Sequence, residues 1–197
     1  MPPSQAFHFC RAMRLLCEDA VSRMADFSHI RMDEVAVAFA QARRHVSHGL
    51  QAKLTPMRFE GGSLVMQRGG QKWTVQRLFE RDREMLYILT FYLPRFQNQP
   101  FREKLITVFH ELYHIGPFFD GDIRRMEGRY HVHSSSQQEY DRQMGEYADR
   151  YLKMCPDESL YDFLRYDFHQ LSRRHGAVVG VQVPIPKLIR ITAKKSA

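Results

Sequence analysis

The chain has no long apolar run, although 44% of its 197 residues are hydrophobic. The longest such run, MLYILTFYL at residues 85–93, is about nine residues, roughly half of what a membrane-spanning helix needs. The first residues, MPPSQAFHFCRAMRLL, place arginines among the apolar side chains, so they do not resemble a secretory signal peptide. These absences predict a soluble, cytoplasmic protein with no membrane partner.

Cysteine is also scarce. Cys10, Cys17 and Cys155 are an odd number and have no CxxC spacing. A disulfide framework or a cysteine zinc ribbon needs more cysteines in closer pairs, so we expect reduced, buried thiols.

Internal repeats and linkers that would divide the chain are missing as well. The length and the 12% aromatic content are enough for one domain with a real core. We predict a single domain over residues 1–186, followed by a basic C-terminal tail at residues 187–197.

The net charge is +7, but outside the tail most basic residues alternate with acidic ones. Such a distribution is typical of a solvated surface and identifies no groove for nucleic acid. Nucleic acid therefore stays a partner that the sequence permits but does not indicate.

The apolar pattern predicts an α+β domain: one helix, several strands, then more helices. A small, mainly antiparallel sheet is expected from the strands, although the alanines in the first strand also allow a helix. The Gly69-Gly70 pair predicts a hairpin turn. Strand 84–93 is apolar on both faces and should be central. The expected helices are 5–24, capped by Ser4, then 101–115, 137–153 and 157–176; the expected strands are 33–41, 53–62, the two arms around Gly69-Gly70, and 84–93.

The segment VFHELYHIG places two histidines, His110 and His114, four residues apart on the expected helix 101–115. This spacing projects both imidazoles from one face, where they can reach one zinc ion at about 2.0–2.1 Å. Glu111 lies beside them, placed to act as a general base towards a zinc-activated water. The alternative is a structural histidine pair that spells the motif by chance.

A catalytic zinc needs a third protein ligand and one open position. His131 and His133 in GRYHVHSSS are the first candidates, and an extended segment would point only one of them at the metal. We favour His133, because it adjoins the expected helix at 137, and keep His131 as the alternative.

Three carboxylates are further candidates for the third ligand. Asp120 lies six residues beyond His114, where some zinc peptidases place a ligand after a glycine turn, although Pro117 occupies the glycine position here. Glu139 and Glu146 lie on the following expected helix.

The segment HELYHIGPFFDGDIRRMEGRYHVHSSSQQEYDRQM resembles the core of zincin-type metallopeptidases, in particular small phage-type and bacterial ones related to the SprT-like group. The resemblance implies a zincin-like fold, with His110, His114 and His133 or His131 as zinc ligands and Glu111 as catalytic base. Zincins bind a peptide beside an exposed sheet edge, for which residues 72–79 or 86–93 are candidates, the former being more polar. The chain lacks the C-terminal zinc ribbon of many SprT-like proteins.

We therefore expect a zinc-dependent metallopeptidase-like hydrolase that acts on protein or peptide amide bonds. The ligand types also accept manganese, iron or nickel. Rival hypotheses are a non-catalytic or nucleic-acid-associated zinc-binding protein of the SprT-like type, and a protease or toxin that a partner activates.

Overall fold

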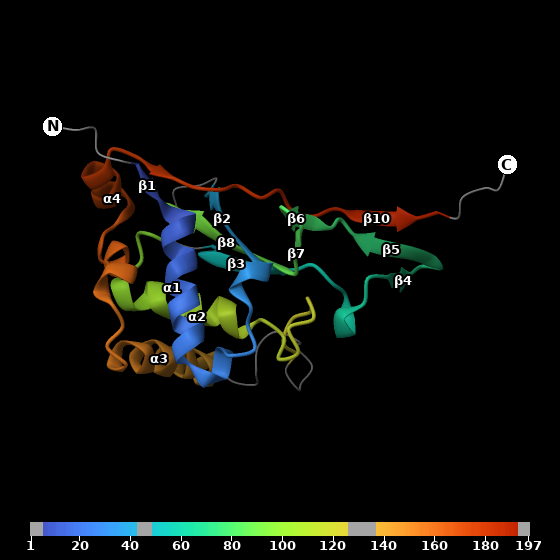
Figure 1. The fold of residues 1–197 in the computed structure, drawn as a ribbon, viewed down its shortest axis with the longest axis horizontal. Coiled ribbons are helices and arrows are strands. Elements are labelled where there is room, and N and C mark those ends of the chain that lie inside the picture. The colour runs from blue at the N-terminus through green and yellow to red at the C-terminus, as the bar shows by residue number, and fades with distance from the viewer. Residues whose placement is uncertain (1–5, 43–48, 126–136, 193–197) are drawn as a thin grey trace.

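The computed structural model describes residues 6–42, 49–125 and 137–192. Figure 1 shows the helices gathered around a central sheet at one end, while a second, three-stranded sheet extends to the other end. The helices are α1 (Phe9–Arg23), α2 (Phe101–Tyr113), α3 (Gln137–Lys153), α4 (Phe168–His175) and the 3-10 helices η1 (Ala25–Phe27), η2 (Met32–Glu34), η3 (Glu60–Gly62), η4 (Glu158–Leu160) and η5 (Asp162–Arg165). The strands are β1 (Phe7–His8), β2 (Val35–Gln41), β3 (Ala52–Pro56), β4 (Met66–Arg68), β5 (Gln71–Val75), β6 (Leu78–Glu80), β7 (Arg83–Met85), β8 (Tyr87–Leu93), β9 (Val178–Val179) and β10 (Leu188–Ile191). The α+β class is confirmed.

The central sheet has the order β2-β8-β3 and is mixed. β2 pairs with β8 in parallel, and β3 pairs with β8 antiparallel. The apolar strand β8 is central, as its two apolar faces predicted. The mainly antiparallel direction expected from sequence does not hold for β2 and β8. These two strands are separated in the chain by β3 to β7, so no local turn fixes their relative direction. The sheets β10-β5-β4 and β6-β7 are antiparallel, and β1-β9 is parallel.

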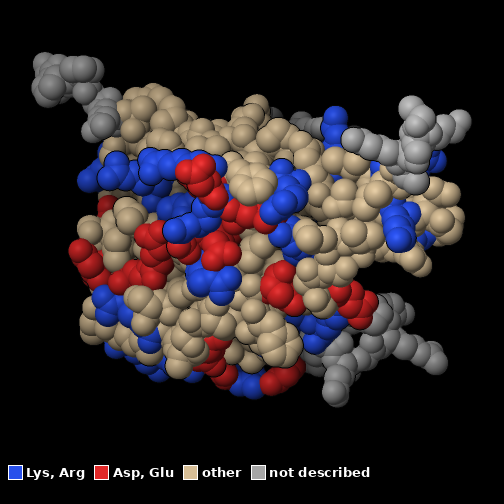
Figure 2. All heavy atoms as spheres, turned by 45° about the vertical axis from the view of Figure 1, so that its right-hand side comes forward, with Lys and Arg blue, Asp and Glu red and all other residues tan. Residues whose placement is uncertain are grey.

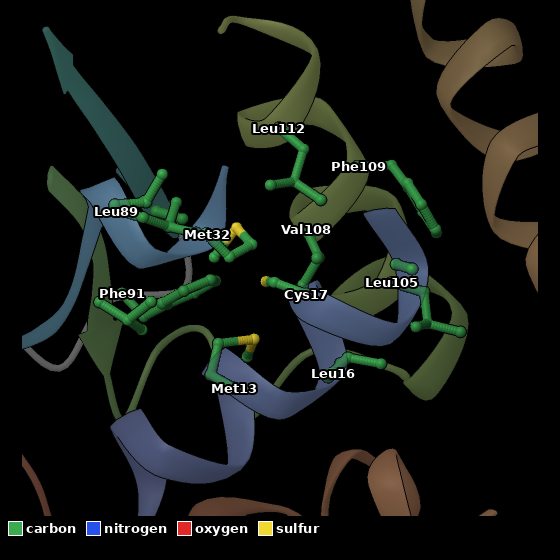
Figure 3. Packing of buried hydrophobic residues seen from close by; sticks show 14 of the residues in the cluster. Met13, Leu16, Cys17, Met32, Leu89, Phe91, Leu105, Val108, Phe109 and Leu112 are labelled. Atoms are coloured by element: carbon green, nitrogen blue, oxygen red, sulfur yellow. The ribbon is translucent and has the colours of Figure 1, made fainter. Parts of the chain in front are cut away.

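Helix α1 buries the stripe that its sequence period predicted. Figure 3 shows Met13, Leu16 and Cys17 from α1 facing Val108 and Leu105 of α2 across the core. The cap differs from the expectation, because the helix begins at Phe9 and the side chain of His8 accepts a hydrogen bond from the Arg11 amide. Ser4 lies outside the described residues.

Helix α2 lies between the central sheet and α3. It begins directly after Pro100 and packs against β3 on one side and α3 on the other. Phe109 makes ring contacts with Tyr147 and Tyr151 of α3. α2 is thus held rigidly from both sides.

The helix expected over residues 157–176 is wrong in its first half. The chain there forms η4 and η5, and only α4 is a regular helix. Buried Gln97 donates to the carbonyl groups of Phe163 and Tyr166, and buried Lys104 donates to those of Leu164 and Tyr166. Carbonyl groups engaged by these side chains are not available to a continuous helix.

The hairpin around Gly69-Gly70 is confirmed, with positive φ angles at both glycines. Its second strand, β5, pairs on the other side with β10. β10 lies at residues 188–191, within the segment expected to be a basic tail, so this part of the tail joins a sheet.

Cys10 and Cys17 are buried free thiols, as expected, whereas Cys155 is exposed, contrary to the expectation. Burial raises the pKa of the Cys17 thiol to about 12. Across residues 6–42, 49–125 and 137–192, the helices are all too short or too polar to cross a bilayer.

Candidate metal centre

The C-terminal end of α2 brings the two motif histidines together. His110 lies in the last turn, and His114 is the C-cap with helical φ and ψ of −67° and −17°. Because the backbone stays helical through His114, both side chains remain on one face. The centroids of the two imidazole rings are 4.7 Å apart and their planes make an angle of 77°. Both residues are half-buried, so the pair is accessible from the surface.

Glu111 is buried beside this pair, with 7% of its surface exposed. Its Oε2 accepts a hydrogen bond of 2.6 Å from the backbone N–H of Leu54 in β3. Burial raises the pKa of the Glu111 carboxyl to about 7, and the Leu54 N–H and the charge of Lys53 act in the opposite direction. The pKa of this carboxyl group is therefore close to neutral pH, whereas an exposed glutamate loses its proton well below pH 7.

Strand β3 can offer this N–H because it lies at the edge of the central sheet. Gln51 and Met57 form the backbone hydrogen bonds to β8 at either end of β3. By antiparallel alternation, Leu54 then points its N–H and C=O away from β8, towards the outer edge of the sheet. Pro56 also occupies an outward position, where its missing N–H costs no ladder bond.

The edge strand expected from sequence was wrong. Residues 86–93 contain β8, which is central in its sheet, and residues 72–79 contain β5, which is central between β10 and β4. Polarity alone suggested residues 72–79, but β10 comes from a distant part of the chain and covers that side. The sheet edge beside α2 is β3.

The chain turns sharply after His114, and Asp122 holds the turn. Its carboxylate accepts hydrogen bonds from the backbone N–H groups of Gly61 and Ile123 and pairs with Arg125. Gly116 donates to the Asp122 carbonyl, and a Cβ at Gly116 would lie 2.7 Å from that oxygen. The loop therefore requires glycine at 116, one position before the proline that interrupts the zincin-type pattern.

Tyr87 joins this loop to the central sheet. Its hydroxyl donates to the Asp122 carbonyl and accepts from the Gly121 N–H. Burial raises the pKa of the Tyr87 phenol to about 12, so it stays protonated and keeps both bonds.

The carboxylate candidates for a third ligand have other partners. Asp120 accepts from the Asp122 N–H, and Glu139 and Glu146 both pair with Arg142 on the surface of α3. Within residues 6–42, 49–125 and 137–192, no three His, Cys, Asp or Glu side chains gather where they could hold a metal ion. Asp120, Glu139 and Glu146 therefore do not join the histidine pair, and His131 and His133 lie outside the described residues.

Two features near the pair were not found from sequence. One is the Leu54 N–H, which no motif marks because it is a backbone group from a distant strand. The other is His29, whose Nε2 is buried with no hydrogen-bond partner among the described residues. Burial lowers the pKa of His29, and the charge of the nearby Arg124 adds to this effect.

Comparisons with protein-family models, with curated proteins and with solved structures gave no match.

Proposed function

We propose that the chain is a zinc-dependent metallopeptidase-like hydrolase that cleaves protein or peptide amide bonds. The observation that carries the proposal is the arrangement at the end of α2. Two half-buried imidazoles share one face, and a desolvated carboxyl group with a pKa near 7 lies between them in sequence.

The described residues supply two of the three protein ligands that a catalytic zinc site needs. His110 and His114 have the spacing and common face that zinc requires, and neutral imidazole is its usual nitrogen ligand. The third ligand would come from residues 126–136, where we keep His133 as first choice and His131 as second. When bound, zinc would polarise the scissile carbonyl and lower the pKa of water towards about 7.

Glu111 has the properties of a general base for this chemistry. A carboxyl group with a pKa close to the working pH can take a proton from water and return it to the leaving amine. The Leu54 N–H holds one oxygen of the carboxyl group, Oε2, and so fixes the orientation of the other. Burial between α2 and β3 keeps bulk water from competing for the same proton.

Among the described residues, β3 is the outer strand of the central sheet beside Glu111, and we infer that the substrate pairs along this edge. The outward C=O of Leu54 and the outward backbone groups of Ala52 follow the same edge that reaches Glu111. An extended peptide paired there would lie next to the end of α2. This supports protein or peptide as the substrate class.

The first experiment is elemental mass spectrometry on protein purified without a metal-affinity tag. The wild type should carry about one zinc per chain. His114→Ala and His133→Ala should lose it, while His169→Ala on the exposed face of α4 should keep it. Loss of zinc in His131→Ala together with retention of zinc in His133→Ala would identify His131 as the third ligand instead of His133.

Hydrolysis of an unstructured protein such as casein then separates catalysis from binding. Glu111→Gln should keep zinc and lose turnover. A chain that binds zinc but shows no turnover that depends on Glu111 would be a non-catalytic zinc-binding protein. Absence of zinc after reconstitution would refute the proposal.

A further inference from the structure

The sheet β10-β5-β4, which we call the projecting sheet, is separate from the metal centre and carries charge of one sign. Its exposed cations are Arg68, Lys72, Lys187 and Arg190. No Asp or Glu occurs in residues 61–79 or after residue 167. In the described part of the chain, none of the four cations pairs with an acid, whereas most acids elsewhere do pair with arginine.

Figure 2 shows the same contrast on the surface. Red and blue are interleaved over the body of the molecule, whereas the right-hand side of the view shows blue and tan in its upper part, with red only below. The projecting sheet is therefore an electropositive surface without internal compensation.

Strand β10 is one of the two outer strands of the projecting sheet, and β4 is the other (Figure 1). The backbone N–H of Gln76 donates to the Lys187 carbonyl. Lys187 is therefore a residue whose backbone groups face the strand β5. By alternation, Leu188 and Arg190 direct their N–H and C=O groups away from β5. In the described residues these four backbone groups meet no other strand, so the edge can accept one more.

All four side chains of β10 are exposed, and three of them are apolar. Leu188, Ile189 and Ile191 are 52%, 48% and 40% exposed. An edge strand of this kind invites pairing with another chain unless it is charged, bulged or covered. Here the only charge on the strand, Arg190, is attractive to an acidic partner.

We propose that the outer edge of β10 binds an extended acidic segment of another protein as an added strand. Backbone groups of Leu188 and Arg190 supply the pairing, apolar side chains pack on the exposed isoleucines, and acidic side chains meet Arg190 and Lys187, while Lys72 and Arg68 further into the sheet add to the positive potential. The charge disfavours a second copy of this chain, because pairing two projecting sheets would bring eight like charges together. This proposal does not depend on the metal centre.

The register defines a probe. A strand antiparallel to β10 should carry acids opposite Arg190 and Lys187 and apolar residues opposite Leu188, Ile189 and Ile191. The matching sequence is Val-Glu-Ile-Val-Glu, to be used as a fluorescein-labelled peptide with flanking glycines. The matched control peptide replaces both glutamates by lysine.

The variants separate charge from backbone pairing. Arg190→Glu should weaken binding of the acidic peptide about fivefold or more, while Arg173→Glu on α4, at the far end of the molecule, should leave it unchanged. Leu188→Pro removes the outward N–H, without taking a hydrogen bond from β5, together with the leucine side chain, and should weaken binding about fivefold beyond Leu188→Ala, as for one lost hydrogen bond. Leu188→Ala controls for the lost side chain.

Fluorescence anisotropy measures the affinity, and amide hydrogen exchange locates the site. The acidic peptide should protect the Leu188 and Arg190 amides, and its affinity should fall between 50 and 500 mM salt, as for exposed charges. Equal binding of the acidic and lysine peptides, or unprotected amides at Leu188 and Arg190, would refute the proposal. Tighter binding of a 20-nucleotide oligo-dT that displaces the peptide would refute it in favour of nucleic acid.

Discussion

Replacement of Glu111 by glutamine should remove catalysis and at the same time stabilise the metal-free protein. The carboxyl group is 7% exposed and has one backbone donor, the Leu54 N–H. Glutamine has the same shape and can accept that hydrogen bond through Oε1. It therefore removes the buried charge and leaves the contact between α2 and β3 in place.

The magnitude follows from the pKa. A carboxyl pKa raised from 4.5 to about 7 means that the folded state holds a proton that the unfolded state has released. The wild type therefore loses stability as pH rises from 4.5 to 7, by about 3 kcal/mol at most. Glu111→Gln lacks this loss. The two proteins should differ little at pH 4.5, and the variant should be more stable by about 1–3 kcal/mol at pH 8.

The assay is urea unfolding in EDTA at pH 4.5, 6 and 8, followed by tryptophan fluorescence and circular dichroism. The control is Glu103→Gln, which lies at an exposed position in the first turn of the same helix. A difference between Glu111→Gln and wild type that stays constant with pH would refute the raised pKa. A variant that is less stable at pH 8 would show that the charge of Glu111 contributes to the fold.

Other perturbations test the groups that hold the site in place. Lys104→Met removes a buried amine whose pKa burial lowers to about 8. The folded state releases this proton at a lower pH than the unfolded state. The free energy of unfolding of the wild type should therefore rise between pH 8 and 10.5 by about 3 kcal/mol relative to the variant. A difference between the two proteins that does not change with pH in urea unfolding would contradict this. Asp122→Ala leaves the part-buried N–H groups of Gly61 and Ile123 without their acceptor and should cost about 1–3 kcal/mol, with weaker zinc binding by calorimetry; native-like stability would contradict the role of the loop. Glu84 is paired with Arg58 and Arg77, and the arginines lower its pKa to about 2. Its contribution is present above pH 4.5 and is lost towards pH 2, so Glu84→Gln should flatten the acid unfolding profile, which thermal melts from pH 2 to 7 can measure.

Local patterns predicted the elements that carry the site. The apolar period of α2 and the proline before it are properties of a short segment, and the four-residue spacing of His110 and His114 follows from helix geometry alone. The strand β8 and the hairpin of β4 and β5 were likewise predicted from side chains that are close in sequence. For these elements, tertiary packing agreed with local preference.

Contacts between distant residues were decided by the tertiary structure. The partner of Glu111 is a backbone N–H in β3, 57 residues away, and a backbone group leaves no mark in a sequence pattern. The edge of the central sheet could not be identified from polarity, because an edge is defined by which strand is missing beside it. The side chains of Lys104 and Gln97 donate hydrogen bonds to carbonyl groups of the segment that was expected to begin a long helix, and this segment is not a regular α-helix. The sequence determined that the two imidazoles share one face of α2. Only the fold decided that the Glu111 carboxyl group accepts a hydrogen bond from β3.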